Sequence, residues 1–199
     1  MSGGALPPAD FARQPLPLAA EPASSLWQRI YKSVHPDPLG FGRSKSRFSD
    51  PTGTQFGLVY LGSSAKVAFA EVVLRDRAVA TINPFPLSQS ELDSYLCADI
   101  ELGQILNLVD LTGDGHLLLR VPTDVTGASD QTLAQIWSKA FYEHSTKPDG
   151  VLYSSRLNEE RNIALYDRAV GKLVARAAPR LAARPELGAI LTDFNIALI

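Results

Sequence analysis

Apolar and polar residues follow one another along this chain in blocks whose spacing predicts the first half of the fold. The run "SLWQRIYKS", residues 25–33, places bulky side chains around a single arginine and predicts a strand that enters the core. Residues 35–54 are dense in proline, glycine and serine, which excludes regular structure and predicts a loop long enough to be functional. "TQFGLVYLG", residues 54–62, then predicts a strand with Leu58 and Tyr60 on one face.

A helix is predicted directly after this strand. "SSAKVAFAEVVLRD", residues 63–76, begins with serines suited to cap a helix and continues with apolar residues at helical spacing. Val67, Glu71 and Leu74 fall on one line of such a helix, at i, i+4 and i+7. Glu71 is therefore expected on or beside the packed face of the helix.

The second half of the chain predicts further strands around another helix. We interpret "ADIELGQILNLVDL" (98–111) as a strand pair and "SDQTLAQIWSKAFYEHS" (129–145) as a capped amphipathic helix. The inward side of that helix is predicted to carry Leu133, Ile136, Trp137 and Phe141. Short apolar runs predict more strands in "DGVLYSS" (149–155), "NIALYD" (162–167) and "KLVARAAPR" (172–180). This order of elements is typical of an α+β fold rather than of regular βαβ winding.

Composition predicts one domain with an extension at each end. The 199 residues have the length of a single domain that can bury a sizeable core. Residues 1–24 are rich in proline, alanine, glycine and serine, so they are expected to form a flexible N-terminal arm. Residues 25–178 would then form the main folded domain and residues 179–199 a C-terminal tail.

Charge and cysteine usage disfavour several classes of protein. The single cysteine, Cys97, cannot form an internal disulfide, and the three histidines lack zinc-site spacing, so a reducing cytoplasmic location is expected. The start of the chain does not resemble a secretion signal, and no apolar run approaches the about 18 residues of a membrane span. Nineteen basic and 21 acidic residues create no overall field toward nucleic acid, so local arginines must meet any bound anion.

Three polar residues stand in apolar surroundings and are the first candidates for chemistry: Arg47, Glu71 and Ser155. Arg47 precedes Phe48, which should anchor it to the core, and its guanidinium is suited to phosphate oxygens, although a solvated basic turn fits the loop's composition equally well. A buried carboxylate is costly without a partner, so Glu71 either pairs with an arginine or faces a pocket. Ser155 ends a strand, and alone it is more typical of a turn.

Arg29 and Tyr60 complete the candidate set. Arg29 interrupts an apolar stretch and is a second candidate for anion binding. Tyr60 is able to stack on a flat ring, although a core tyrosine with a hydrogen-bonded hydroxyl is the commoner outcome. The sequence contains no GxxxxGK[ST] phosphate loop, no complete dinucleotide fingerprint and no GxSxG nucleophile elbow.

Arg47, the segment "LVYLGSSAKVAFAEV" and the distant "GVLYSSR" together resemble the RES domain, a family of toxins from bacterial toxin–antitoxin pairs. The resemblance covers about residues 26–170 and implies a fold similar to that of ADP-ribosylating toxins, with a split, mostly antiparallel sheet and flanking helices. It implies NAD as the substrate, no metal, and neutralisation by a cognate antitoxin with an Xre-type helix-turn-helix region. Family members transfer ADP-ribose to water, phosphate or a protein. The two extensions resemble the ParT-like branch, which modifies phosphoribosyl pyrophosphate synthetase.

The resemblance implies a role for each candidate. The residues that name the family fall on Arg47, Glu71 and Ser155, and Arg29 and Tyr60 match its early arginine and strand tyrosine. Glu71 would stabilise the positive charge that develops on the ribose, Arg29 and Arg47 would hold the diphosphate, and Ser155 would orient nicotinamide or ribose. A non-catalytic binding module remains the other interpretation, in which Arg47 and Glu71 pair with each other.

Three positions qualify the match. Phe48 stands where many relatives have tryptophan, and Ser154 where they have proline, so Ser154 remains an alternative to Ser155 as the functional serine. Asn162 falls in a family frame "N.AL" and is expected to be structural. Direct contact with nucleic acid is not expected, because the chain has no basic stripe and no helix-turn-helix pattern.

Overall fold

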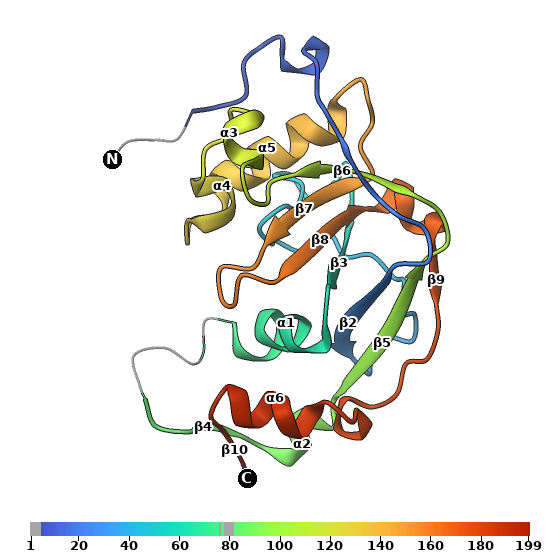
Figure 1. The fold of residues 1–199 in the computed structure, drawn as a ribbon, viewed down its shortest axis with the longest axis vertical. Helices are drawn as coiled ribbons and strands as arrows, with labels where there is room; N and C mark the ends of the chain where they lie inside the picture. Colours follow the sequence, from blue (N-terminus) through green and yellow to red (C-terminus); the bar gives the residue numbers. More distant parts are fainter. Residues whose placement is uncertain (1–4, 76, 78–81) are drawn as a thin grey trace.

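The fold is α+β, as the element order predicted, and is built on one large sheet (Figure 1). The computed structural model describes residues 5–75, 77 and 82–199. In this part of the chain the sheet has eight strands in the order β1-β6-β7-β8-β3-β2-β5-β9. Their bounds are Ala19–Glu21 (β1), Leu26–Lys32 (β2), Leu58–Gly62 (β3), Tyr95–Leu102 (β5), Leu106–Asp110 (β6), Gly150–Ser154 (β7), Arg161–Tyr166 (β8) and Leu173–Ala175 (β9). Neighbouring strands are antiparallel except for β6 and β7.

The sheet divides into two parts between β3 and β2. These strands are registered through one residue pair, Gln28 with Gly62, whereas β2 and β5 are registered over seven pairs and β3 and β8 over five. The sheet is thus split, as the resemblance implied. The divergence leaves room beside the sheet, and this is where the candidate site lies.

The helices gather at the two ends of the molecule (Figure 1). The end near the N-terminus carries α3 (Gly115–Leu118), α4 (Asp124–Gly127) and α5 (Thr132–Glu143). The other end carries α1 (Ala65–Phe69), which continues as the π-helical segment η2 (Ala70–Leu74), and α2 (Gln89–Leu92) and α6 (Leu187–Asp193). A small parallel pair of strands, β4 (Phe85–Leu87) and β10 (Ile196–Leu198), lies beside them. Short 3-10 helices are η1 (Phe11–Arg13), η3 (Asp167–Lys172) and η4 (Leu181–Ala183).

Alternating side chains bury the central strands on both faces. Along β3, Leu58 packs in a core that includes α5, and Val59 packs in a second core on the opposite face. Tyr166 and Leu165 of β8 alternate in the same way. This period of two is the ordinary side-chain geometry of a strand, so the apolar runs were reliable strand predictions.

The prediction of a strand pair over 98–111 is wrong in its pairing. Both strands form, as β5 and β6, but β5 pairs with β2 and β9, and β6 pairs with β1 and β7. The connection, residues 103–105, does not form a hairpin, because both edges of β5 are occupied, by β2 and by β9. The Gly103 N–H donates to the Lys172 carbonyl 2.8 Å away. Since β5 and β6 are far apart in strand order yet adjacent in sequence, the sheet must curl to bring them together.

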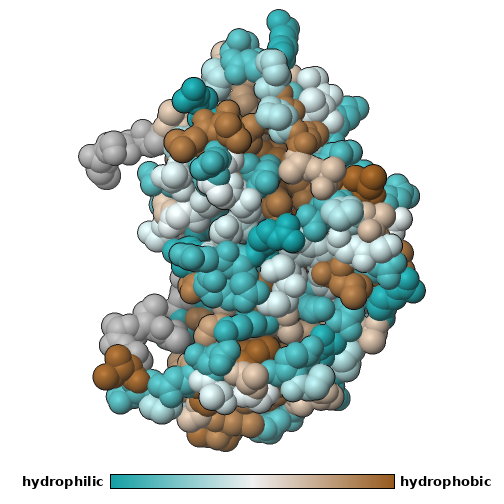
Figure 2. Space-filling view, viewed as in Figure 1, coloured by the Kyte–Doolittle hydropathy of each residue, from teal (hydrophilic) through white to brown (hydrophobic). Residues whose placement is uncertain are grey.

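The expectation of a flexible N-terminal arm differs from the structure over residues 5–24. β1 extends the sheet by pairing with β6, and the buried Phe11 ring meets Trp137 of α5 edge-on, with 5.3 Å between centroids. The Trp137 indole N–H also donates to the Ala5 carbonyl. The residues of this segment are on average small and polar or proline, as in flexible segments. Two buried side chains, Phe11 and Leu16, nevertheless attach it to the core. Figure 2 shows hydrophobic residues continuing over this end near α3, where Leu118 is 77% exposed.

The C-terminal residues 179–199 are also folded. They form η4, α6 and β10, and Leu181, Leu187 and Ile190 enter a third core together with Phe69 of α1. Lys66 of α1 also donates to Asp193 of α6 at 2.6 Å. The C-terminal segment therefore supports the helix that carries Glu71.

The two predicted helices form, with differences in detail. Ser64 caps α1 by accepting from the Val67 N–H, but the regular helix ends at Phe69 and the π-helical η2 follows. Residue 76, the last of the predicted helix, lies outside the described residues. In α5, Trp137 and Phe141 are buried as predicted, whereas Leu133 and Ile136 are only partly buried.

Candidate active site

A cavity of about 310 Å³ lies where β2 and β3 diverge, covered by the 35–54 loop and by η2. Four of the five sequence candidates line it, namely Arg29, Arg47, Tyr60 and Glu71. The fifth, Ser155, lies behind Glu71 and is hydrogen-bonded to it. The fold thus brings together residues that are up to 126 positions apart in the sequence, from Arg29 to Ser155.

Glu71 is held by Ser155. The Ser155 hydroxyl donates to Glu71 Oε1 at 2.8 Å and accepts from the Leu157 N–H at 3.1 Å. Ser155 is 1% exposed, so its hydroxyl is fixed inside the protein, whereas Ser154 is the last residue of β7 and pairs in register with Arg161. The geometry therefore favours Ser155 over Ser154 as the partner of the carboxylate.

The π-helical turn determines where Glu71 points. A π-helical turn has an i→i+5 pattern, rotates the following side chains relative to a regular helix, and occurs often at functional sites. Here it begins at Ala70, directly before Glu71, while Ala70 and Val73 stay buried in the same segment. The segment therefore keeps its apolar anchors while the carboxylate lines the cavity.

Arg47 reaches the cavity from a loop that is fixed on both sides. Phe48 is fully buried, its carbonyl accepts from the Ser138 hydroxyl at 2.6 Å, and its N–H donates to the Tyr60 hydroxyl at 3.1 Å. Arg47 itself is 5% exposed and donates to the Ala128 carbonyl at 2.8 Å. The anchoring by Phe48 that the sequence predicted is confirmed.

The electrostatic surroundings of Arg47 are strongly cationic. Burial lowers the pKa of its guanidinium, and the charges of Arg156 and Arg75 lower it further, against opposite effects of Tyr153 and Glu71. Arg75 and Lys45 also line the cavity. Guanidinium groups are suited to hold phosphate oxygens, so a bound phosphate or diphosphate would form charge-assisted hydrogen bonds with this cluster.

Arg29 has a structural role that the sequence did not reveal. Its guanidinium donates to the carbonyls of Pro38 and Gly40, at 2.6 and 2.7 Å, and lies 5.6 Å from the centre of the Tyr31 ring. Burial lowers its pKa, with smaller opposing effects from Tyr31 and Asp37. Arg29 therefore fixes the first part of the covering loop as well as lining the cavity. Such contacts to backbone carbonyls leave no trace in a sequence motif.

Tyr60 has the hydrogen-bonded hydroxyl that is expected of a core tyrosine. Its hydroxyl is hydrogen-bonded to the Ser46 hydroxyl at 2.9 Å and accepts from the Phe48 N–H. The residue also lines the cavity. Burial raises its pKa, so the phenol stays protonated near neutral pH. Tyr60 thus holds the loop that presents Arg47.

Sequence reasoning missed two aromatic residues of the cavity, Tyr31 and Tyr153. Tyr153 packs against Phe48 with 4.9 Å between ring centroids, and burial raises its pKa well above the usual value. It belongs to "GVLYSSR", a motif that was used only to locate the serine. Arg43, by contrast, does not line the cavity: it donates to the Thr54 carbonyl and lies 3.9 Å from Asp167.

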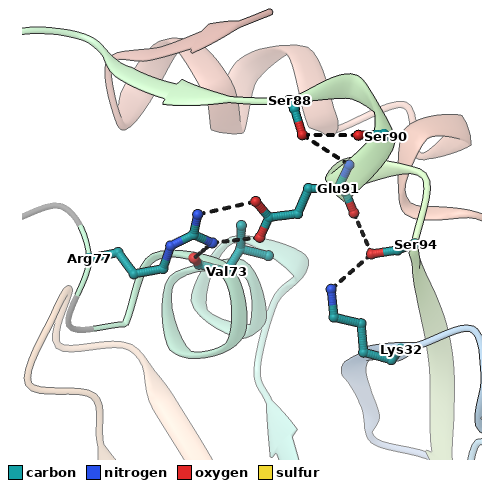
Figure 3. A network of polar contacts seen from close by, with 7 residues as sticks. All are labelled: Lys32, Val73, Arg77, Ser88, Ser90, Glu91 and Ser94. Carbon is teal, nitrogen blue, oxygen red and sulfur yellow. Dashed lines mark hydrogen bonds and ion pairs between the residues drawn. The ribbon is translucent and has the colours of Figure 1, made fainter.

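A polar network braces the C-terminal end of η2 (Figure 3). The Arg77 guanidinium forms a fork to the Glu91 carboxylate at 2.5 and 3.1 Å and also donates to the Val73 carbonyl. Ser94 donates to the Glu91 carbonyl and receives a bond from Lys32 Nζ at 2.8 Å. The network connects the π-helical segment with α2 and β2, so the position of Glu71 is supported from both directions along the chain.

The alternative of a structural pair between Arg47 and Glu71 is not what these contacts show. Among the described residues no ion pair joins the two; the carboxylate is bonded to Ser155 and the guanidinium to the Ala128 carbonyl. Within the same residues, no three His, Cys, Asp or Glu side chains are grouped as metal ligands, and no helix is long and apolar enough to cross a membrane.

Known proteins share both the sequence and the fold. The RES domain model matches residues 26–186. A probable toxin, y4kH, of Sinorhizobium fredii is 44% identical over 127 residues, which are 63% of this chain and 100% of that protein. The solved MbcT–MbcA toxin–antitoxin complex of M. tuberculosis contains a chain with a similar fold, at a TM-score of 0.64 and 20% identity, covering 88% of this chain and 91% of that one.

Proposed function

The chain belongs to the RES domain family, and from this premise we propose that it is a toxin that consumes NAD and transfers ADP-ribose to a protein. The observation that carries the proposal is the Glu71 carboxylate, fixed by Ser155 and lining a cavity rich in arginine. The name of the similar protein from Sinorhizobium fredii, a probable toxin, supports the same class.

The cavity suits the chemical groups of NAD. Arg29, Arg47 and Arg75 offer guanidinium groups for a diphosphate, and Tyr31 and Tyr153 offer aromatic surface for a flat ring. The cavity is lined by both kinds of residue, so a dinucleotide can contact them together. Besides these guanidinium groups and aromatic rings, the cavity offers the carboxylate of Glu71, the negative charge that the bond cleavage requires.

The reaction breaks the bond between nicotinamide and ribose. The bonding electron pair leaves with the nicotinamide nitrogen, which becomes neutral, and positive oxocarbenium character develops on the ribose. We assign Glu71 the role of stabilising that charge, as a preorganised carboxylate is able to do. The acceptor then donates its electron pair to the ribose carbon and loses a proton. Ser155 acts through Glu71 as a positioning residue, which differs from the direct contact with substrate that the family resemblance implied.

The acceptor decides between the members of this class. We propose a protein acceptor, with phosphoribosyl pyrophosphate synthetase as the first to test; transfer to water or phosphate would make the chain an NAD glycohydrolase or an NAD phosphorylase. Mass spectrometry of the products distinguishes the three, as a modified protein, free ADP-ribose or phosphorylated ADP-ribose. Addition of cellular extract supplies a protein acceptor that a purified reaction lacks.

A cognate antitoxin is the proposed partner. The similar fold in the MbcT–MbcA complex supports a toxin–antitoxin pair, and we propose that the partner here is of the Xre type and acts with the toxin in the cytoplasm. Co-expression with the neighbouring open reading frame should yield a complex and restore growth. A chain that is toxic alone and remains equally toxic with that partner would refute this part of the proposal.

The experiment that tests the enzymatic function is release of nicotinamide from NAD. Glu71→Ala should remove most of the activity, whereas Glu101→Ala should not, since Glu101 lies outside the cavity and pairs with Arg176 on the surface. Thermal melts of Glu71→Gln address the binding-module alternative. A large loss of stability would favour a structural role, and near-native stability with lost activity would favour catalysis. Absence of release with every acceptor would refute the proposal.

A further inference from the structure

Asn162 is a buried polar residue with an unused hydrogen-bond donor. It lies in the central strand β8, is 3% exposed and lines the cavity. Its Nδ2 is buried, and within the described part of the chain it has no hydrogen-bond partner. The expectation that Asn162 is simply structural does not explain this atom.

The register places Asn162 in a row of residues that face the cavity. It pairs with Tyr153 of β7 on one side and with Gly62 of β3 on the other, and Gly62 pairs with Gln28 of β2. Directly paired residues share a face of the sheet, and all four line the cavity. Gly62 has no side chain to offer a partner, and the Gln28 amide nitrogen already donates to Asp99 Oδ1 at 3.0 Å. Among these four residues, Asn162 is the one whose side-chain donor is both fully buried and without a partner in the described part of the chain.

An amide in this position is unfavourable unless something else binds it. Asparagine is depleted in strands, and a buried donor without a partner loses its bonds to water without replacement. Exchanging the amide oxygen and nitrogen would leave an acceptor in the same position without a partner, so the choice of amide orientation does not remove the problem. An apolar residue would suit the strand better, which indicates that the amide serves a ligand.

We propose that Asn162 is a substrate-binding residue whose Nδ2 donates to an acceptor oxygen at the reacting end of the dinucleotide, and this rests on the proposed function. The acceptor is the carboxamide oxygen of nicotinamide or a ribose hydroxyl. Both belong to the part of NAD that must meet Glu71, which lines the same cavity. Through this bond Asn162 selects a ligand with an oxygen at that position and fixes it beside the carboxylate.

The test compares stability and binding in Asn162→Leu, with Asn107→Leu as the matched control. Asn107 is an exposed asparagine on β6 of the same sheet and lies outside the cavity. The probe is carba-NAD, whose nicotinamide cannot be cleaved off, measured by calorimetry and by the ligand-induced rise in Tm. Asn162→Leu should keep or raise the Tm of the free protein, because it removes an unsatisfied polar group, and should weaken binding about tenfold, the usual value of one hydrogen bond.

Each outcome decides the question. Wild-type protein that binds carba-NAD, together with Asn162→Leu that binds it equally well, overturns the role of Asn162 but leaves the proposed function standing. Wild-type protein that does not bind it overturns both. Because leucine itself can disturb packing, Asn162→Ala is measured as well, and a large loss of stability in both variants shows that the amide is structural. Carba-NAD with a thioamide in place of its carboxamide locates the acceptor: an unchanged tenfold effect assigns the ribose, and a vanishing effect assigns the carboxamide.

Discussion

Ser155→Ala tests most directly how the site is organised. The substitution removes the hydroxyl of a buried residue, which donates to Glu71 Oε1 at 2.8 Å beside the cavity. It also leaves the Leu157 N–H without its side-chain acceptor. The backbone of Ser155 keeps its bonds to Glu159 and Glu160, so the turn between β7 and β8 should persist.

The magnitude follows from the type of bond that is lost. A hydrogen bond to a charged group contributes about 1.5–3 kcal/mol, and if all of it serves to hold the carboxylate for the transition state, kcat falls by about 10- to 150-fold. KM should change little, because Ser155 is not among the residues that line the cavity. The free energy of unfolding should fall by up to about 3 kcal/mol, because a hydrogen bond to a charged group is lost.

The assay is the initial rate of nicotinamide release, measured over a range of NAD concentrations by chromatography. Ser154→Ala is the matched control, since Ser154 is adjacent in sequence and ends β7. In a Glu71→Gln background, Ser155→Ala should cost little more, because the two residues act as a unit. Full activity of Ser155→Ala, or an additive loss in the double variant, would refute the idea that Ser155 acts through Glu71.

Three further predictions concern the loop, the anion site and the acid stability. Arg47→Lys keeps the charge but loses the guanidinium fork, so KM for NAD should rise about tenfold with a smaller effect on kcat; a change in kcat alone would contradict this in steady-state kinetics. Tyr60→Phe removes the hydroxyl that holds residues 46–48 and should lower the free energy of unfolding in urea by about 1–3 kcal/mol; an unchanged midpoint would speak against it. The hydrogen bonds from Arg77 hold the pKa of Glu91 in the folded chain below its usual value. Ionised Glu91 therefore stabilises the folded chain at pH values above the unfolded pKa of about 4.3. This stabilisation is lost as the pH falls through the lower pKa of the folded chain. Glu91→Gln should therefore have a lower Tm than wild type at neutral pH, and the difference in Tm between the two should become smaller below about pH 4. A difference in Tm that stays constant with pH would exclude this linkage.

Local features of the fold could be predicted from the sequence because they depend on near neighbours. Ser64 caps α1 within three residues, and alternating side chains define β3 and β8. The pairing of β5 could not be predicted in this way, since its partner β2 lies about 70 residues earlier, as Gln28 with Asp99 illustrates. Likewise, Phe11 is recognisable as an anchor only once Trp137 is known to face it.

The candidate site shows the same division. Arg47, Glu71 and Ser155 could be found because each is a polar residue in an apolar run, although their mutual contacts could not. Asn162 and Tyr153 could not be recognised as cavity-lining residues, because an asparagine and a tyrosine in a strand do not stand out until the register faces them toward a cavity. The π-helical turn at Ala70 likewise has no simple signature in residue spacing.

The long separation between Glu71 and Ser155 has a consequence for biosynthesis. The bond that fixes the carboxylate joins residues 84 positions apart, and β8, which carries Asn162, is made later still. A ribosome adds about 5–20 residues per second, so the nascent chain exists for several seconds with the helix of Glu71 already made and its partner not yet synthesised. During translation the incomplete chain cannot assemble the site, which becomes complete only after nearly the whole polypeptide has emerged.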